Sequence, residues 1–485
     1  MATLVGEVSL ELAPNSGTGR SHSSNPLVHQ PTTSTMTRIT LLGAGRSASS
    51  LIQYLLRHAL TENWQLTVAD VNPAHLVPVL AAHTEYARAV PFAIEDAARL
   101  EELVAEADVV ISMLPALLHG PVARACVQHG RHLATASYVS EEIRALDAEA
   151  RAAGSTLLME CGLDPGLDHM SAMAVLDEVR ARGGQLTSFK SYCGGLLAPD
   201  SEGGNPWQYK FTWNPRNVVL AGQSTAKYLE NGHPRYIPYQ HLFARTETIE
   251  VPGYGSFDGY ANRDSLSYRA PYGLDDIPTM LRGTLRRAGY CAAWHALVRL
   301  GLTDDSVHLG NAAAISWREL LAAYLPAADV PTEAALAAQC ANYLGLAPDG
   351  PEMQRLQWLG LFTDRSVGLA DATPAQLLER LLTDKWQLQP HDHDMIVMQH
   401  LFEYELQGVH HARTSSLVVL GDDATHTAMA KTVGLPLGMA VRRLARGEVP
   451  QRGVVIPTDA SLYAPILAEL AEDYGIRFEE AETAR

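Results

Sequence analysis

The chain has 485 residues, which is too long for one hydrophobic core and predicts two or three domains. Its net charge of −17 argues against broad binding to nucleic acids or anionic membranes, since both favour basic surfaces. No run of residues is long and apolar enough to cross a bilayer, and the five scattered cysteines include no Cys-x-x-Cys pair. These features predict a cytoplasmic protein with reduced thiols and without a nucleic-acid or membrane partner.

The first 37 residues are rich in Ser, Thr, Pro and Asn. They lack the basic start and long apolar region of a secretory signal. We therefore expect residues 1–37 to form a disordered tail, and Met36 could be the true start of translation.

A dinucleotide-binding pattern begins directly after this tail. The segment RITLLGAGRSASSLIQYLL is a short apolar run, a glycine turn and a helix with one apolar stripe. Its centre has the G-x-G-x-x-A form, in which the first glycine permits a tight turn and the second lets a pyrophosphate approach the backbone. The predicted cofactor-binding residues here are Gly43, Ala44, Gly45, Arg46 and Ser47, and Ala48 allows close helix–strand packing.

A second strand, WQLTVADV, ends at an acidic residue, Asp70. A carboxylate at this position can accept hydrogen bonds from both ribose hydroxyls and repels a 2′-phosphate. Val71 stands where an enzyme that prefers the phosphorylated cofactor often has an arginine. The pair favours NAD as the cofactor, with NADP as the alternative.

Two later apolar segments, ADVVISMLP and HLATASY, are predicted to be further strands of the same sheet, with the helix HGPVARACVQHG between them. Alternating strands and helices predict an α/β fold with an N-terminal Rossmann domain.

Two polar clusters could hold a metal ion or catalyse a reaction. The segment GLDPGLDH places Asp164, Asp168 and His169 close together, although a loop entering a helix would give the same letters. The segment QPHDHDMIVMQH has a spacing that could bind zinc, through His391, Asp392, His393, Asp394 and His400. The residues alone do not choose between these interpretations.

Several long segments are more specific than a glycine fingerprint. They are ATASYVSEEIRAL, LLMECGLDPGLDHMSAMAVLDEV, FKSYCGGLLAPDSEGGNPWQYKFTWNPRNVVLAG, YANRDS, MLRGTLRRAGY, WLGLFTD, HDMIVMQHLFEYE and MAKTVGLPLGMAVRRLARGEV. These segments resemble saccharopine dehydrogenase of the glutamate-forming type, also called saccharopine reductase, and they extend over nearly all of the chain after the tail.

The resemblance implies three parts: a Rossmann domain, a mixed α/β substrate domain and a helical insertion. We place the Rossmann domain at 38–162, joined by about 425–450, and the substrate domain at 163–285, continued by about 391–424 and 451–485. The helical insertion is expected at 286–390, where ISWRELLAAYL and PAQLLERLLTDKW have helical periodicity.

Such an enzyme reversibly oxidises saccharopine to glutamate and 2-aminoadipate 6-semialdehyde, through hydride transfer and hydrolysis of an imine, in lysine metabolism. For proton transfer, the resemblance implies Tyr138, Asp164 and Cys193, in the intact motifs ASY, GLDPG and SYCGG. An aspartate in such a pocket can accept a proton, and a tyrosine or thiol can donate one. A buried cysteine is also a common apolar filler, which is the alternative for Cys193.

For the substrate carboxylates, Arg263 is the leading candidate because its planar fork suits two-pronged binding. The alternative is a structural ion pair with Asp264. The further substrate-binding residues that the resemblance implies are Ser137, Tyr138, Asp164, Gly283, Thr284 and Leu285.

The remaining implied cofactor contacts are Ile94, Leu114, Ala136, Ser137, Leu163, Asp164, Pro165 and Trp213, although a tryptophan considered alone would more often belong to the core. The resemblance also decides the two polar clusters. Asp164 is the catalytic candidate, Asp168 and His169 begin the next helix, the added histidines at 391–393 form a solvated loop, and no metal site is predicted.

Two rival functions remain. A carboxynorspermidine or carboxyspermidine dehydrogenase would perform a similar coupling, but its cationic substrates should recruit carboxylates rather than the NRDS and GTLR segments. A non-catalytic dinucleotide-sensing protein should have lost the residues for proton transfer. The predicted assembly is a homodimer, and a preference for NAD would fit lysine breakdown better than synthesis.

Overall fold

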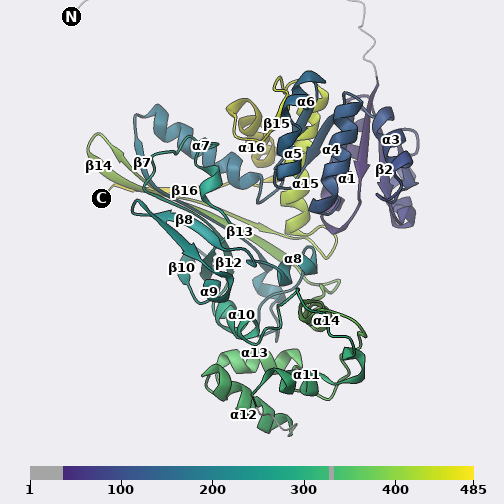
Figure 1. The fold of residues 1–485 in the computed structure, drawn as a ribbon. Coiled ribbons are helices and arrows are strands. Elements are labelled where there is room, and N and C mark those ends of the chain that lie inside the picture. Colours follow the sequence, from purple (N-terminus) through teal and green to yellow (C-terminus); the bar gives the residue numbers. More distant parts are fainter. Residues whose placement is uncertain (1–35, 327–331, 485) are drawn as a thin grey trace, which may run out of the picture. The chain divides into compact units, whose positions relative to one another are not determined.

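The computed structural model describes residues 36–326 and 332–484 (Figure 1). Most of the predicted tail, 1–37, therefore lies outside the described residues. Thr37 itself begins the first strand, β1 (Thr37–Leu42). No helix within the described ranges is long and apolar enough to span a membrane.

The first layer is a seven-stranded sheet in which every paired strand is parallel, in the order β15-β6-β5-β4-β1-β2-β3. Ile39 and Leu41 of β1 belong to one hydrophobic cluster and Leu42 to another, so both faces of the sheet are buried. The α/β Rossmann prediction is confirmed. The strands are β1, β2 (Trp64–Asp70), β3 (Ala87–Pro91), β4 (Val109–Ser112), β5 (His132–Thr135), β6 (Thr156–Leu158) and β15 (Gly453–Val455).

Helices cover both faces of this sheet, and the longer ones bury an apolar stripe. They are α1 (Ser49–Ala59), α2 (Val77–Leu80), α3 (Ala97–Glu106), α4 (His119–Gln128), α5 (Glu141–Ala145), α6 (Asp147–Ala152), α15 (Ala428–Ala445) and α16 (Ala460–Tyr474).

The C-terminal part of the chain returns to the first sheet. Helix α15 packs against α1, where a Cβ atom on Gly434 would lie only 2.7 Å from the backbone nitrogen of Leu51. Strand β15 follows and pairs with β6. The range 451–485 is predicted above to continue the substrate domain, and for β15 this is wrong. A strand of three residues is too short to show a periodicity in sequence.

The second layer is a nine-stranded mixed sheet with the order β10-β11-β12-β7-β13-β14-β16, and β8 and β9 attached at β12. The pair β7–β12 is parallel and β7–β13 is antiparallel, which confirms the predicted mixed sheet. The strands are β7 (Gln185–Leu197), β8 (Ala226–Glu230), β9 (His233–Ile237), β10 (Thr246–Val251), β11 (Gly255–Ala261), β12 (Thr279–Arg287), β13 (Asp394–Leu406), β14 (Val409–Leu420) and β16 (Glu479–Ala484).

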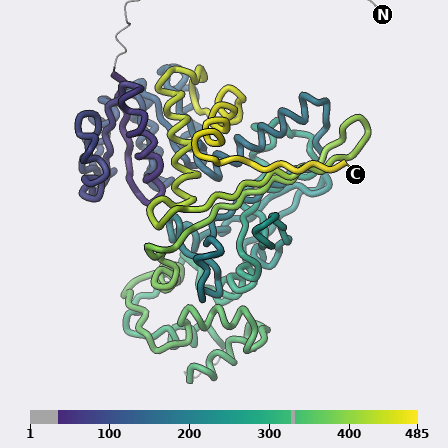
Figure 2. Tube along the Cα trace, turned by 180° about the vertical axis from the view of Figure 1, so that it is seen from behind, coloured from purple at the N-terminus to yellow at the C-terminus, as the bar shows by residue number. Residues whose placement is uncertain are grey.

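Figure 2 shows the end of the chain running along this second sheet, where β16 pairs with β14. Helix α7 (Leu167–Ala181) packs on β7 and α16, and short helices α8 (Pro215–Val219) and α9 (Tyr239–Leu242) lie between the strands in sequence.

The predicted insertion is helical in its described residues. Two of its helices begin with a capping box, formed by Ser316 with Glu319 and by Thr373 with Gln376, which explains where both start. Its helices are α10 (Tyr290–Arg299), α11 (Trp317–Tyr324), α12 (Glu333–Leu344), α13 (Pro351–Leu359) and α14 (Pro374–Trp386).

Candidate active site

The glycine loop after β1 touches the loop after β4. Gly43 has a φ of +89°, and a Cβ atom there would lie 3.2 Å from the backbone of Met113, so only glycine fits without strain. A Cβ atom on Gly45 would meet no protein atom within 4 Å. The protein itself therefore does not need a glycine at 45, which agrees with the predicted approach of a ligand at this point.

Asp70 supports the glycine loop at the end of β2. Its Oδ2 accepts a hydrogen bond from the backbone N–H of Ala44 at 2.8 Å, and its Oδ1 accepts one from Asn72 at 2.9 Å. Val71 is 75% exposed and brings no positive charge. The side chains at the predicted ribose position thus present a carboxylate and an exposed apolar group.

The other predicted cofactor residues follow neighbouring parallel strands. Leu114 follows β4, the residues 136–138 follow β5 and the residues 163–165 follow β6, so all lie at the carboxyl edge where such sheets bind ligands. Arg46 and Ser47 begin the short turn of helix that leads into α1. Ile94 follows β3, at the far edge of the sheet from β5 and β6. Half-buried Trp213 packs against the cores of both layers.

Ser137 is held by a buried histidine. Its Oγ lies 2.7 Å from Nε2 of His119, whose Nδ1 lies 2.8 Å from Oγ of Ser112. Burial lowers the pKa of His119 to about 4, so its ring is neutral near pH 7 and one ring nitrogen carries the only proton. This chain of hydrogen bonds connects the loops after β4 and β5.

Two of the three predicted proton-transfer residues are in direct contact. The hydroxyl of Tyr138 donates a hydrogen bond to Oδ1 of Asp164 at 2.6 Å. The same oxygen accepts a hydrogen bond from Nη2 of Arg282, on β12, at 2.8 Å. Cys193 lies on β7, is 7% exposed and belongs to the hydrophobic cluster against which Tyr138 packs.

The buried setting shifts these groups toward their neutral forms. Burial and the charge of Asp168 raise the pKa of Asp164, although Arg282 opposes the shift. Burial and the charge of Asp164 raise the pKa of both Tyr138 and Cys193 well above their ordinary values. Cys193 is therefore a neutral thiol at physiological pH, and not a thiolate nucleophile.

Arg282 and Asp168 also belong to this buried cluster, which the sequence does not predict. Nη2 of Arg282 donates to Oδ2 of Asp168 at 2.5 Å, and its guanidinium lies 4.2 Å from the ring centroid of Tyr268. Asp168 does lie in the first turn of α7, as predicted, but its side chain pairs with this arginine. The available signal is that Arg282 and Arg286 lie four residues apart, and so on one face, in the strand MLRGTLRR.

His169, the neighbour of Asp168, belongs to a second group of buried hydrogen bonds. His169 has Nε2 at 2.7 Å from Glu160 and Nδ1 at 2.5 Å from the hydroxyl of Tyr272. The hydroxyl of Tyr268 also donates to Glu160, at 2.9 Å. The predicted helix start is thus also a hydrogen-bonded support for the catalytic candidates.

Arg263 lies in the loop after β11, exposed and with a φ of +36°. Its guanidinium is 5.5 Å from the ring centroid of Tyr138. The alternative ion pair with Asp264 is not formed, because Asp264 pairs with Lys227 at 3.3 Å. Within the described ranges no carboxylate pairs with Arg263, so its charge is available to a ligand.

The predicted segment 283–285 lies beside Cys193. Thr284 is in register with Cys193 across the β7–β12 pair, so both side chains point to the same face as Arg282. Leu285 is fully buried in the core of the opposite face. A Cβ atom on Gly283 would clash with the ring of Tyr192, so packing alone requires this glycine.

Arg286, two residues after Thr284, is a second arginine that the sequence interpretation missed. It is 5% exposed, and its guanidinium lies 5.1 Å from the ring centroid of Tyr209 and 5.5 Å from that of Tyr290. In the described part of the chain, Arg286 has no carboxylate partner and its Nε has no hydrogen bond. It adds positive charge to the face that carries Thr284.

The second polar cluster is dispersed among separate partners. Asp392 pairs with Lys210 at 2.5 Å and His393 with Asp200 at 3.0 Å. Asp394 accepts hydrogen bonds at the start of α15, and His400 bonds to Ser171 and Ser191. His391 is exposed. Over residues 36–326 and 332–484, no group of three or more His, Cys, Asp or Glu side chains could hold a metal ion.

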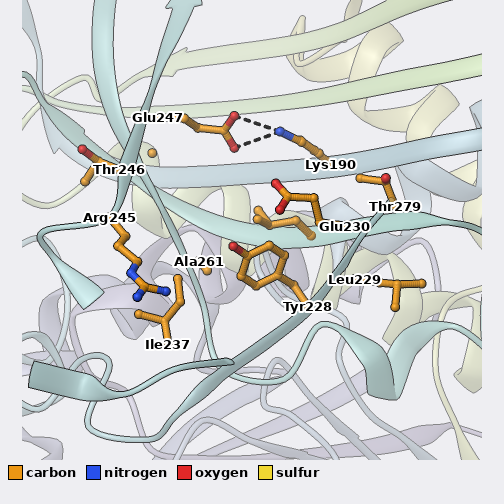
Figure 3. Close-up of a pocket in the computed structure, with 12 residues that line it drawn as sticks. Lys190, Tyr228, Leu229, Glu230, Ile237, Arg245, Thr246, Glu247, Ala261 and Thr279 are labelled. Carbon is orange, nitrogen blue, oxygen red and sulfur yellow. Dashed lines mark hydrogen bonds and ion pairs between the residues drawn. The ribbon is translucent and has the colours of Figure 1, made fainter. Parts of the chain in front are cut away.

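A hollow of about 210 Å³ lies in the second layer, and its lining residues Lys190 and Glu247 are paired at 2.9 Å. Figure 3 shows this pair among the other lining side chains. Lys190 and Leu281 line the hollow and are in register across β7 and β12. Since side chains alternate along a strand, this hollow lies on the opposite face from Arg282 and Cys193. It is separate from the candidate active site.

A dinucleotide-binding loop at the carboxyl edge of a parallel sheet, with the hydrogen-bonded Tyr138 and Asp164 at the same edge, is typical of a nicotinamide-dependent oxidoreductase. Two family models match: "Saccharopine dehydrogenase NADP binding domain" over residues 39–158 and "Saccharopine dehydrogenase C-terminal domain" over residues 162–476. The chain therefore belongs to the saccharopine dehydrogenase family, and the resemblance found in the sequence is confirmed.

Similar proteins cover nearly the whole chain. "Saccharopine dehydrogenase [NADP(+), L-glutamate-forming]" of Schizosaccharomyces pombe is 35% identical over 92% of this chain and 99% of its own length. The Saccharomyces cerevisiae protein of the same name is 34% identical with the same coverage. The solved apo structure of the Saccharomyces cerevisiae L-Glu-forming enzyme has a TM-score of 0.82 at 32% identity, and the match covers 92% of this chain and 100% of that one.

Proposed function

We propose that the protein oxidises saccharopine reversibly to glutamate and 2-aminoadipate 6-semialdehyde, with a nicotinamide dinucleotide as hydride acceptor. The observation that carries the proposal is the contact of Arg282 with Tyr138 and Asp164, which follow strands at the edge of the first sheet that carries the dinucleotide loop. The names of relatives that match over 92% of the chain support the substrate.

The reaction requires proton transfer at a nitrogen and at a water molecule. The bound nicotinamide supplies the hydride acceptor, and the resulting imine of the substrate is hydrolysed. Asp164 is the group that accepts a proton from the substrate amine or the attacking water. Tyr138 orients Asp164 through its hydrogen bond, and Cys193 contributes a neutral thiol.

The substrate carboxylates need positive charge. Arg263 and Arg286 both lack a carboxylate partner within the described residues, and Thr284 lies between the buried Arg286 and Arg282 on one face of β12. Such a surface suits an anionic substrate better than a polyamine, which would need carboxylates. This disfavours the carboxynorspermidine alternative.

The first experiment follows the near-ultraviolet absorbance of the reduced nicotinamide with purified protein. Saccharopine should give a signal, whereas carboxynorspermidine in a parallel cuvette should give none. A signal with the polyamine alone would overturn the proposed substrate, and no signal with either would favour a non-catalytic protein.

We further propose that the cofactor is NAD. The matching relatives are named as NADP(+) enzymes and the family model as an NADP-binding domain, but Asp70 and exposed Val71 oppose a 2′-phosphate in this chain. A carboxylate near the ribose favours its free hydroxyls and repels the added phosphate. An NAD preference would fit lysine breakdown better than lysine synthesis.

The combined change Asp70→Ala with Val71→Arg should shift the kcat/KM ratio toward NADP by about tenfold or more, because it replaces one repulsive charge by an attractive one. Steady-state rates with both cofactors measure the shift. Val71→Arg alone is the control, since it retains the carboxylate and should shift the ratio less. An unchanged ratio in the double variant would contradict the assignment of the ribose site.

The change Arg263→Ala should raise the KM for saccharopine by about tenfold to a hundredfold, since a charge-assisted hydrogen bond contributes about 1.5–3 kcal/mol. The KM for the cofactor should stay unchanged. Arg235→Ala removes an exposed arginine that pairs with Glu230 and serves as the control. Equal effects of Arg263→Ala on both KM values would indicate a structural role.

A homodimer and a cytoplasmic location remain predictions. Light scattering of the purified protein would test the first, and localisation of a tagged chain in its own cell would test the second.

A further inference from the structure

We propose that Arg282 is a positioning residue for Asp164: it fixes the Oδ1 atom of this carboxylate and leaves Oδ2 as the atom that exchanges a proton with the substrate. Asp168 pairs with the same arginine and holds Arg282 in place. The inference rests on the proposed function of Asp164 and specifies how that group is prepared for it.

The hydrogen bonds distinguish the two oxygens of Asp164. Oδ1 accepts from both Tyr138, at 2.6 Å, and Arg282, at 2.8 Å. Within the described parts of the chain, Oδ2 has no hydrogen bond. The side chain of Asp164 is 18% exposed, against 8% for Arg282 and 2% for Asp168. Asp164 is thus the most exposed of these three charged side chains.

Arg282 is held firmly from several sides. Its Nη2 contacts Asp168 at 2.5 Å, and its guanidinium stacks 4.2 Å from the ring centroid of Tyr268. Asp168 is fixed in turn, because its Oδ1 accepts the backbone N–H of Gly166 at 2.6 Å. The backbone N–H of Arg282 donates to Oγ of Ser265 at 2.8 Å. A group held in this way imposes one orientation on the carboxylate that it binds.

Arg282 therefore pairs with two carboxylates, Asp164 and Asp168. As a result, Arg282 and Asp168 have opposite effects on the pKa of Asp164. The groups that face Asp164 are Tyr138 after β5, Asp168 and His169 on α7, Arg282 on β12 and Cys193 on β7. The negative charge of Asp168 raises the pKa of Asp164, whereas the positive charge of Arg282 lowers it. Loss of either partner should move this pKa in a predictable direction.

The alternative is a buried ion pair that only supports the fold. Breaking such a pair would lower stability, and the amount of active enzyme with it, without a directed change in the pH dependence of the remaining activity. The pH profile therefore separates the two roles.

The test compares the kcat/KM profile for saccharopine against pH in Arg282→Met, Arg282→Lys and Asp168→Asn. The proton acceptor must be ionised, so activity falls on the acid side of its pKa. The acid limb should move up by about 1–3 pH units in Arg282→Met and down in Asp168→Asn. Arg282→Lys should restore the limb part of the way.

Lys210→Met is the matched control, because it breaks another largely buried ion pair, with Asp392, and neither of these residues bonds to Asp164, Arg282 or Asp168. It should lower stability without moving the limb. If Arg282→Met does not fold, Asp168→Asn decides alone, since the expected direction of its shift is opposite to that of simple damage. If the acid limb of the kcat/KM profile stays in place in the folded variants, the proposal is wrong.

A second measurement does not need turnover. Carbon-13 NMR of labelled aspartate carboxyls, with the Asp164 signal assigned by its loss in Asp164→Asn, titrates this group directly. Opposite shifts in the Arg282 and Asp168 variants would support the positioning role even if saccharopine were not the substrate. Turnover of saccharopine without these shifts would overturn the positioning role and leave the proposed function intact.

Discussion

Replacing Asp164 with Asn should lower kcat for saccharopine oxidation by about 10²–10⁴-fold, the usual contribution of a general acid–base group. Asparagine keeps the shape of the side chain and can still accept the hydrogen bonds of Tyr138 and Arg282 on its oxygen, but it cannot take a proton. Steady-state rates at saturating saccharopine and saturating cofactor measure the loss.

The pH dependence provides a second readout of the same variant. Burial and Asp168 raise the pKa of Asp164, so the acid limb of kcat/KM in the unaltered protein should lie above the ordinary range of a carboxylate. This limb should disappear in Asp164→Asn. Asp392→Asn is the matched control, because Asp392 is 2% exposed and pairs with Lys210 rather than with Tyr138 or Arg282. An Asp164→Asn enzyme with nearly full activity and the same limb would exclude Asp164 as the proton acceptor.

Replacing Gly434 with Ala should destabilise the protein by about 1–3 kcal/mol, which is the usual effect of overpacking. At an unobstructed helix position the same change stabilises by about 0.5–1 kcal/mol, so the sign of the effect is informative. The added Cβ atom would lie 2.7 Å from the backbone nitrogen of Leu51, in the first turn of α1, and backbone in a packed helix cannot move away easily. The midpoint of urea unfolding measures the change.

Gly438→Ala is the comparison variant on the same helix. Its Cβ atom would approach the ring of Tyr54, at 2.5 Å from Cδ1, and a side chain can shift more readily than backbone. We therefore expect a smaller loss of stability than at Gly434. A gain of stability in Gly434→Ala would mean that α15 and α1 are not in the close contact described above.

The local parts of the site could be predicted from the sequence. The tight turn at Gly43 and the helix that follows depend on neighbouring residues, so the fingerprint places them correctly. The capping boxes at Ser316 and Thr373 are equally local, and so the helical insertion was predictable. Tyr138 and Asp164 were found through the resemblance of long segments, since their contact spans 26 positions of the chain.

The parts of the site that could not be predicted depend on contacts between residues that are far apart in the sequence. Arg282 contacts Asp164 and Asp168 across 118 and 114 positions, and no local pattern announces such a partner. An acidic residue in the first turn of a helix is usually explained by the helix dipole, which concealed the ion pair of Asp168. Strand β15 adds only three residues to a sheet that is defined elsewhere in the chain.

The return of α15 and β15 to the first sheet has a consequence for the order of events during synthesis. Leu51 and Leu55 of α1 share a buried cluster with Leu437 and Val441 of α15, and β6 obtains its outer neighbour only from β15. When only the first 162 residues have been synthesised, the cofactor domain therefore still lacks one covering helix and one edge strand. Translation must pass Val455 before the first sheet is complete, so this sheet is finished only after most strands of the second sheet have been made.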